Sequence, residues 1–192
     1  MFRRVFIVRH CQSEANRDRR AEGQGDSVLT TLGLDQARRR ALSLVEHDLT
    51  AAVLVSSPLQ RAASTAREIA SHHGWDLSHD ARLMEGDFGW MEGLSYEEIR
   101  AHVPEGSVWV TADTHGGESL ETVGLRMREA LLAALQRSEG AVIVVSHGFA
   151  IAALLANLGH KGPLMMSNGD MLDLDLDETV AICRLTHHPL EA

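Results

Sequence analysis

The chain contains 192 residues, of which 18 are Lys or Arg and 27 are Asp or Glu, and its formal net charge at pH 7 is −9. This length is sufficient to bury a hydrophobic core without disulfides or a structural metal, and we expect a single domain over residues 1–192. The acidic balance argues against nucleic acid as a partner, because binding to a phosphate backbone depends on an excess of lysine and arginine.

The sequence also predicts a cytoplasmic protein without a membrane partner. Its longest apolar segment, residues 149–158, is far shorter than the roughly 20 residues that cross a bilayer. Cys11 and Cys183 are too few and too far apart for a disulfide framework, and no apolar leader with a cleavage site precedes the first strand-like run.

Three short β-branched runs, each followed by a polar break and a helical pattern, predict strands that are joined by helices. They comprise residues 5–8, 52–56 and 141–145. The first and third runs are apolar at every position, which is typical of strands covered by helices on both faces. The sequence therefore predicts an α/β fold with a mostly parallel sheet.

Helical patterns occupy residues 32–47 and 120–137, and a further helix is expected to begin at Ser57 or Pro58. We expect Ser57 to be its N-cap, with Gln60 at the capping-box position. Strict alternation over residues 171–177 predicts a strand that has one solvated face and lies near a sheet edge. Residues 86–117, which are rich in Gly and Trp, predict a loop or helical insertion that shapes a substrate pocket.

Candidate catalytic residues follow the predicted strands, where ligands bind in such sheets. Arg9 and His10 end the first strand, Arg61 lies in the first turn of the helix after the second, and His147 follows the strand at 141–145. The two arginines can hold phosphate oxygens in bidentate fashion. His10 can attack phosphorus through one ring nitrogen while the other donates to a backbone carbonyl, and a cationic His147 would stabilise the transferring group.

A proton donor completes the requirements of phosphomonoester hydrolysis, because the departing oxygen must be protonated. We expect a carboxyl group whose pKa is raised by partial burial and by the charge of the phosphate. Glu85 and Asp87 are the candidates.

Residues 9–16, which read Arg-His-Cys-Gln-Ser-Glu-Ala-Asn, resemble the R-H-G-x-[ST]-x-x-N signature of the histidine phosphatase superfamily. This superfamily includes the cofactor-dependent phosphoglycerate mutases. Residues 56–62, 85–93 and 145–148 resemble, in the same order, its second-arginine segment, its acid loop and its second-histidine segment. The resemblance covers nearly the whole chain.

The resemblance implies a three-layer α/β/α sandwich around a central, mostly parallel mixed sheet, with neither a metal nor another cofactor. It implies that His10 is the phosphorylated residue and that Glu85 is the proton donor. It further implies a set of phosphate ligands: Arg9, Asn16, Arg61 and His147.

The expected function is hydrolysis of a small phosphorylated metabolite through a phosphohistidine intermediate. The chain resembles the shorter phosphatase branches more than the mutases, which carry a longer insertion between the acid loop and the second histidine. A mutase, which returns the phosphoryl group to a second hydroxyl of its substrate, is the first alternative. A non-catalytic protein that binds a phosphorylated ligand is another, although the intact candidate residues argue against it. The oligomeric state is left open.

Three other motifs suggest rival enzymes. Residues 10–17 spell the H-C-x5-R signature of cysteine-based phosphatases, with Cys11 in place of the usual glycine of the histidine family, but Glu14 would repel phosphate in such a loop. Residues 175–179 match the D-x-D-x-T motif of magnesium-dependent phosphatases that use an aspartate nucleophile. Those enzymes carry the motif after an early strand, and too little chain follows it here. Residues 144–148 are similar to the nucleophile elbow of α/β-hydrolases, G-x-S-x-G, but they lack its first glycine.

Overall fold

The protein is described by a computed structural model that places residues 2–47, 49, 52–102, 116–162 and 165–190. The six strands among these residues form one mixed sheet in the order β3-β2-β4-β1-β5-β6. Strands β1 to β4 are parallel to one another, whereas β5 and β6 are antiparallel to their neighbours. The strands are β1 (Arg3–Arg9), β2 (Val53–Ser56), β3 (Leu77–His79), β4 (Val142–Ser146), β5 (Met171–Leu176) and β6 (Ile182–His188).

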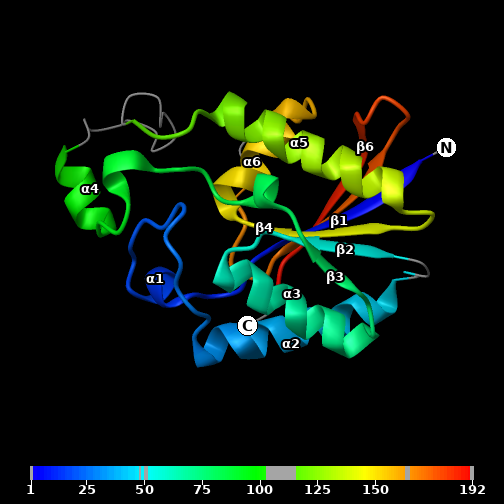
Figure 1. Ribbon diagram of the computed structural model, residues 1–192, viewed down its shortest axis with the longest axis horizontal. Helices are drawn as coiled ribbons and strands as arrows, with labels where there is room; N and C mark the ends of the chain where they lie inside the picture. The colour runs from blue at the N-terminus through cyan, green and yellow to red at the C-terminus, as the bar shows by residue number, and fades with distance from the viewer. Residues whose placement is uncertain (1, 48, 50–51, 103–115, 163–164, 191–192) are drawn as a thin grey trace.

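Helices cover both faces of the sheet, with α5 and α6 on one face and α2 and α3 on the other (Figure 1). The helices are α1 (Glu14–Arg17), α2 (Thr31–Ser43), α3 (Gln60–His73), α4 (Tyr96–His102), α5 (Leu120–Arg137) and α6 (Gly148–Asn157). Three 3-10 turns are η1 (Leu44–Glu46), η2 (Ala81–Leu83) and η3 (Gly89–Met91). The predicted three-layer α/β/α sandwich with a mixed sheet is therefore confirmed. None of the helices among the placed residues has the length and apolar character that crossing a membrane requires.

The central strands are apolar throughout because both of their faces are buried. In β1, Val5 and Ile7 pack in the core beneath α5 and α6, whereas Phe6 and Val8 pack in the core beneath α2 and α3. Successive side chains of a strand point to opposite faces, so a strand between two helical layers needs an apolar residue at each position.

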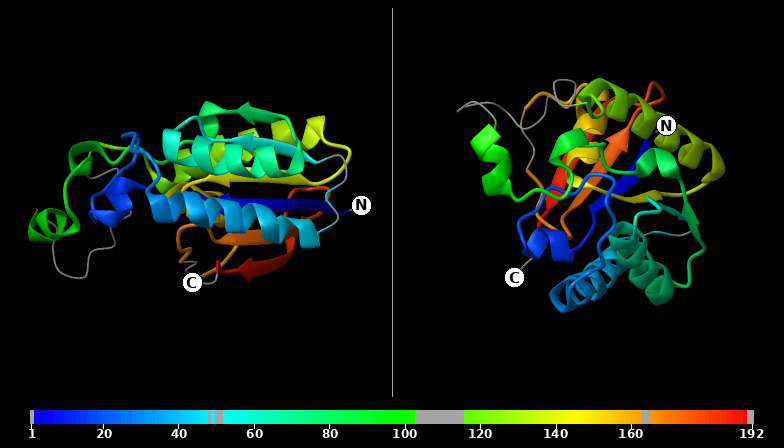
Figure 2. Two further views of the ribbon diagram at one scale, coloured as in Figure 1. Left: turned by 90° about the horizontal axis from the view of Figure 1, so that it is seen from below. Right: turned by 60° about the vertical axis from the view of Figure 1, so that its left-hand side comes forward.

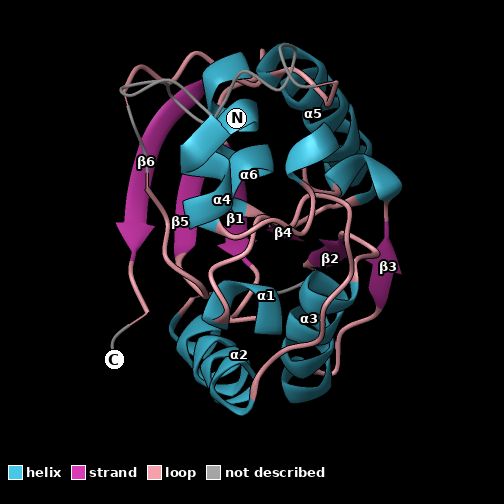
Figure 3. Cartoon of the chain, turned by 90° about the vertical axis from the view of Figure 1, so that its left-hand side faces the viewer, coloured by secondary structure: helices cyan, strands magenta, loops and turns pink. Residues whose placement is uncertain are grey.

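The register of β1 and β4 brings two candidate residues together. Arg9 pairs with Ser146, and the backbone N–H of His10 donates to the carbonyl of Ser146 at 2.8 Å. His10 and His147 thus leave the carboxyl ends of adjacent strands side by side. The segments that carry α1 and α4 lie beyond this end of the sheet, opposite the chain's N-terminus (Figure 2), and Figure 3 looks onto it.

The prediction for the start of α3 was wrong. The helix begins at Gln60, and Leu59 occupies the N-cap position without a capping side chain. The Ser57 hydroxyl instead accepts from the backbone N–H of Leu59 at 3.3 Å and lies 2.8 Å from Nε2 of His147. The Ser57 side chain, which the local sequence predicts as a helix cap, therefore contacts His147 instead.

The strand predicted at residues 171–177 exists as β5, and it lies near a sheet edge as predicted, next to the edge strand β6. The prediction of a solvated polar face was wrong at Asp173. Asp173 is only 2% exposed, and its carboxylate pairs with Arg4 at 2.9 Å and with Arg184 at 3.3 Å. Strand β6, which was not predicted, covers that side of β5 and supplies Arg184. The alternation reflects ion pairs across neighbouring strands.

Gly124 allows α5 and α6 to pack closely, because a Cβ atom there would lie 2.7 Å from the carbonyl oxygen of Ala153. Replacing glycine by alanine inside a helix normally stabilises it by about 1 kcal/mol. Here the contact with backbone should reverse the sign, and we expect Gly124→Ala to lower the free energy of unfolding by about 1–3 kcal/mol in a urea titration. The matched control is Leu125→Ala at a half-exposed neighbour, with an expected change of about 0.5 kcal/mol or less. A stabilised Gly124→Ala protein would contradict the close packing.

Candidate active site

His10 is held as a neutral imidazole with one nitrogen committed to the backbone. Its side chain is 3% exposed, and Nδ1 lies 2.8 Å from the carbonyl oxygen of Cys11, to which it can donate. Burial, together with the charges of Arg61 and Arg9, holds the pKa of His10 well below its usual value. This arrangement places the proton on Nδ1 and leaves the lone pair on Nε2, which is the form a nucleophile requires.

His147 lies beside His10, with ring centroids 5.1 Å apart. The Ser57 hydroxyl can donate to its Nε2, and its buried Nδ1 has no hydrogen-bond partner among the described residues. The prediction that His147 is cationic does not hold for the free protein. Burial and the nearby Arg61, His10 and Arg9 hold the pKa of His147 well below its usual value.

Arg9 and Asn16 present polar groups to the same pocket. The terminal NH1 of Arg9 donates to the carbonyl of Met166, whereas its buried Nε has no partner among the described residues. Asn16 belongs to a capping box at the start of α1, in which its Oδ1 accepts from the backbone N–H of Ser13. The same oxygen accepts from Asn168 at 2.8 Å. The Asn16 carbonyl is therefore occupied, and its NH₂ group is the end that a ligand can use.

Arg61 is buried near both histidines, but its terminal nitrogens already have partners. NH1 donates to the carbonyl of Gly25 at 2.7 Å and lies 3.5 Å from the carboxylate of Glu22. NH2 donates to the carbonyls of Gly23 at 2.7 Å and Glu22 at 3.3 Å. The bidentate hold on phosphate that was predicted for Arg61 is not prepared in this arrangement. Its charge nevertheless acts on both histidines and helps to keep them neutral.

The structure places Glu85, rather than Asp87, against the pocket. The Glu85 carboxylate accepts backbone N–H groups of Gly86 at 3.0 Å, of Ala150 at 2.8 Å and of Phe149 at 3.2 Å. The last two belong to the first turn of α6, where unpaired N–H groups favour an anion. Burial nevertheless prevails and raises the pKa of Glu85, so its protonated form persists to a higher pH than that of an exposed glutamate.

The segment at residues 165–170 completes the site and was not identified from the sequence. The Asn168 amide donates to the carbonyl of His10 at 3.1 Å as well as to Asn16. The backbone N–H of Gly169 lies 3.2 Å from the same His10 carbonyl. The Asn168-Gly169 dipeptide indicates a turn, which was the available signal, but nothing in the sequence says that this turn meets the end of β1.

Arg9, His10, Asn16 and Glu85 line a cavity of about 340 Å³, a size suited to a small molecule, whereas Arg61 and His147 lie behind its lining. Glu22 and Tyr96 are further polar residues of the lining, and most of the remaining lining is apolar. Arg20 adds a second cation to the lining, and its NH1 donates to the carbonyl of Gly93 at 2.8 Å. The apolar lining residues are Ala21, Phe88, Met91, Phe149, Ala152, Met165 and Met166.

Cys11 points away from this chemistry. Its side chain is fully buried in a small apolar cluster with Leu29 and Ala37. Burial raises the pKa of its thiol to about 12, so the thiolate that a cysteine-based phosphatase needs is scarce at neutral pH. Cys11 contributes packing and a carbonyl acceptor for His10, and the rival mechanism loses its nucleophile. No group of three or more His, Cys, Asp or Glu side chains in the placed parts of the chain is arranged to hold a metal ion.

The α/β sheet and the paired histidines at its carboxyl end define a phosphatase or mutase-like enzyme. The chain belongs to the histidine phosphatase superfamily (branch 1), whose family model matches residues 5–189.

Both kinds of enzyme occur among its relatives. A probable phosphoglycerate mutase GpmB from Serratia proteamaculans is 34% identical over 163 residues, which are 80% of this chain and 74% of the relative. The structure of a mycobacterial glucosyl-3-phosphoglycerate phosphatase in complex with VO3 is 31% identical, covers 98% of this chain and 100% of its own, and superposes with a TM-score of 0.83. Another structure, named mycobacterial hydrolase 1, covers 100% of both chains at 31% identity and a TM-score of 0.83.

Proposed function

We propose that this protein hydrolyses phosphomonoesters in two steps through a phosphohistidine at His10. The observation that carries the proposal is the state of this side chain. Its Nδ1–H is committed to the Cys11 carbonyl and its pKa is lowered, so the Nε2 lone pair is available for in-line attack on phosphorus.

In the first step, Nε2 of His10 forms a bond to phosphorus while the bond between phosphorus and the leaving oxygen breaks. Glu85 gives its proton to that oxygen, and the product alcohol departs. The raised pKa of Glu85 supports this role, because a carboxyl that keeps its proton to a higher pH than an exposed glutamate is better suited to act as a general acid.

In the second step, water attacks the phosphohistidine and the P–N bond breaks. The Glu85 carboxylate left by the first step accepts a proton from the water. Inorganic phosphate then leaves, and both His10 and Glu85 have returned to their starting states.

Polar atoms without partners support a phosphate site around His10. Nε of Arg9 and Nδ1 of His147 are both buried and unpaired among the described residues, and burial of an unpaired donor is costly unless a ligand supplies the acceptor. Asn16 lines the cavity together with Arg9 and His10. A bound dianion would also favour the protonated form of His147, which recovers the cationic role predicted from the sequence.

The leaving group that we propose has an apolar body next to the phosphate. Phe88 and Phe149 lie edge to face in the cavity wall, with ring centroids 5.9 Å apart. Arg20 is the one cation besides Arg9 among the described lining residues, so the outer wall offers little to a leaving group with several negative charges. This composition favours hydrolysis of a small phosphomonoester over isomerisation of a phosphoglycerate.

The mutase is the second candidate, because relatives that are 34% identical are named probable phosphoglycerate mutases. A mutase would isomerise a phosphoglycerate without a net release of inorganic phosphate. The proposed hydrolase would release one inorganic phosphate for each alcohol formed. Incubation with phosphoglycerate and with glucosyl-3-phosphoglycerate, with both products quantified, separates the two reactions.

The direct test of the proposed function is turnover of an aryl phosphomonoester in the presence of a metal chelator. We expect stoichiometric release of inorganic phosphate without any added metal, and inhibition by vanadate, which imitates the transferring phosphoryl group. Turnover that requires added magnesium would overturn the metal-free mechanism. Binding of inorganic phosphate without turnover of any phosphomonoester would favour the non-catalytic alternative.

A further inference from the structure

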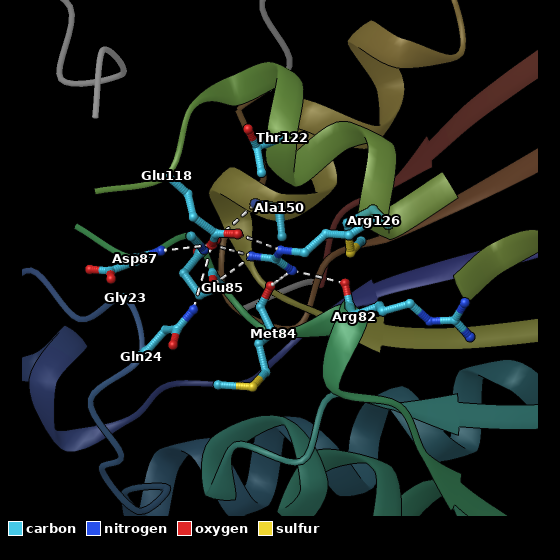
Figure 4. Close-up of polar contacts among 12 residues, drawn as sticks. Gly23, Gln24, Arg82, Met84, Glu85, Asp87, Glu118, Thr122, Arg126 and Ala150 are labelled. Carbon is cyan, nitrogen blue, oxygen red and sulfur yellow. Dashed lines mark hydrogen bonds and ion pairs between the residues drawn. The ribbon is translucent and has the colours of Figure 1, made fainter. Parts of the chain in front are cut away.

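Arg126 is a partly buried cation of α5 that holds the acid loop without lining the cavity. Its NH1 donates to the carbonyls of Arg82 at 2.8 Å and Met84 at 2.7 Å. Its NH2 donates to the carbonyl of Glu85 at 2.9 Å. One guanidinium therefore satisfies three carbonyls that lead up to, and include, the candidate proton donor (Figure 4).

Glu118, just before α5, completes the arrangement. Its carboxylate receives Nε of Arg126 at 2.9 Å and NH2 at 2.7 Å, a bidentate pair that fixes the plane of the guanidinium. The same carboxylate accepts the backbone N–H of Asp87 at 3.1 Å, and the Glu118 N–H donates to the Asp87 carbonyl at 2.9 Å. The pair thus holds the main chain on both sides of Glu85.

The close approach of the two segments needs a residue without a side chain. A Cβ atom at Gly117 would lie 2.2 Å from the carbonyl oxygen of Asp87, so only glycine fits there. Gly117 thus brings Glu118 within reach of the acid loop.

The Glu85 side chain is anchored separately from its main chain. Its carboxylate contacts backbone N–H groups at the start of α6, while Arg126 and Glu118 hold the backbone that carries it. Removing the Arg126–Glu118 pair would leave the Glu85 carboxyl attached to α6, while the backbone around Glu85 would lose four hydrogen bonds to side chains. The proton would then be displaced from the position in which it can reach a leaving oxygen, and an error of about 1 Å is costly in such a transfer.

We infer that the Arg126–Glu118 pair is the positioning device for the proton donor, acting on Glu85 through the main chain of the acid loop. The inference rests on the proposed function, since it assigns the pair to the step in which the leaving oxygen is protonated. A general loss of folding would affect all substrates alike. A displaced acid should affect only those substrates whose leaving group needs a proton.

The experiment compares an alkyl phosphate with a dinitrophenyl phosphate, whose leaving group departs without protonation. The readout is kcat/KM, which reports steps up to the first irreversible one and so isolates phosphoryl transfer to His10. We expect Glu118→Gln and Arg126→Gln to lower kcat/KM for the alkyl phosphate by about 10–100-fold, because general acid catalysis supplies about 10²–10⁴-fold. The value for the dinitrophenyl phosphate should stay within about 3-fold.

The conservative and control variants keep the test decisive. Arg126→Lys keeps the charge but not the planar fork, so it should lose activity on the alkyl phosphate to an intermediate degree. Glu129→Gln and Arg137→Gln change the same charges at exposed positions of α5 and should behave like the unaltered protein. Thermal unfolding shows whether each variant is folded. If Arg126→Gln does not fold, Arg126→Lys replaces it in the comparison of the two substrates.

Three results would overturn the inference or its basis, and they can be told apart. Equal losses on both substrates would show that the pair only supports the fold, and no loss on either would show that it does not position the acid. The reference variant is Glu85→Gln. If it also spares the alkyl phosphate, the proposed role of Glu85 fails, and the positioning role of the pair fails with it.

Discussion

Replacing His10 by alanine is expected to lower kcat/KM for an aryl phosphomonoester by at least about 10⁴-fold, because removing a covalent nucleophile leaves only the binding and electrostatic contributions of the site. The unaltered protein should form a phosphoenzyme during turnover that is labile in acid and stable in base, and its label should map to His10. The alanine variant should form none. A normal phosphoenzyme in His10→Ala would contradict the assignment.

The matched control for this experiment is Cys11→Ser, because Cys11 is the adjacent nucleophile. Its thiol is fully buried and has a pKa of about 12, so it should not carry the phosphoryl group. We expect Cys11→Ser to keep kcat/KM within about 3-fold and to keep the phosphohistidine, while the buried hydroxyl lowers the free energy of unfolding by about 1–3 kcal/mol. A phosphorylated Cys11 in the unaltered protein would restore the rival mechanism.

The sequence was most informative where a residue has one dominant environment. The strands β1 and β4 were predictable because both of their faces are buried, so the apolar runs are continuous. Strand β6 was not, because it is an edge strand whose mixed polar sequence shows neither a clear alternation nor an apolar run. Part of the predicted insertion, residues 103–115, lies outside the described residues.

Within the site, the sequence indicated which residues meet but not what state they are in. The sequence placed His10 and His147 after strands, at the end of the sheet where ligands bind. The low pKa of each histidine depends on burial and on the charge of Arg61, which belongs to another element. Arg61 donates to backbone carbonyls within residues 22–25. Every residue has a backbone carbonyl, so the sequence does not reveal which ones accept a hydrogen bond. Asn168 was missed for the same reason, since it acts on the carbonyl of His10 across the fold.

Loss of the proton donor should have an effect on activity that is second only to loss of His10. We expect Glu85→Gln to lower kcat/KM for an alkyl phosphate by about 10²–10⁴-fold, because an amide cannot give a proton to the leaving oxygen. A dinitrophenyl phosphate should be almost unaffected in the first step. Since the second step also needs this carboxylate, hydrolysis of the dinitrophenyl phosphate should show a burst of one equivalent of dinitrophenol followed by slow turnover.

Asp87→Asn is the matched control, because Asp87 was the other candidate donor. Its Oδ1 accepts the backbone N–H of Gly89 at 2.8 Å, and it does not line the cavity. We expect similar losses on both phosphates, if any. A loss confined to the alkyl phosphate in Asp87→Asn, together with its absence in Glu85→Gln, would transfer the donor role to Asp87.

The pH dependence gives an independent check on Glu85. Burial raises its pKa, so in the free enzyme the donating form is present at low pH and disappears as the pH rises through that raised value. In the unaltered protein, kcat/KM for the alkyl phosphate should therefore fall on the alkaline side at a pH above the usual range of a glutamate. Glu85→Gln should remove this alkaline limb, because the variant has no proton to donate. The dinitrophenyl phosphate should lack the limb in both proteins, because its leaving group needs no proton. An alkaline limb that persists in Glu85→Gln would show that another group donates the proton.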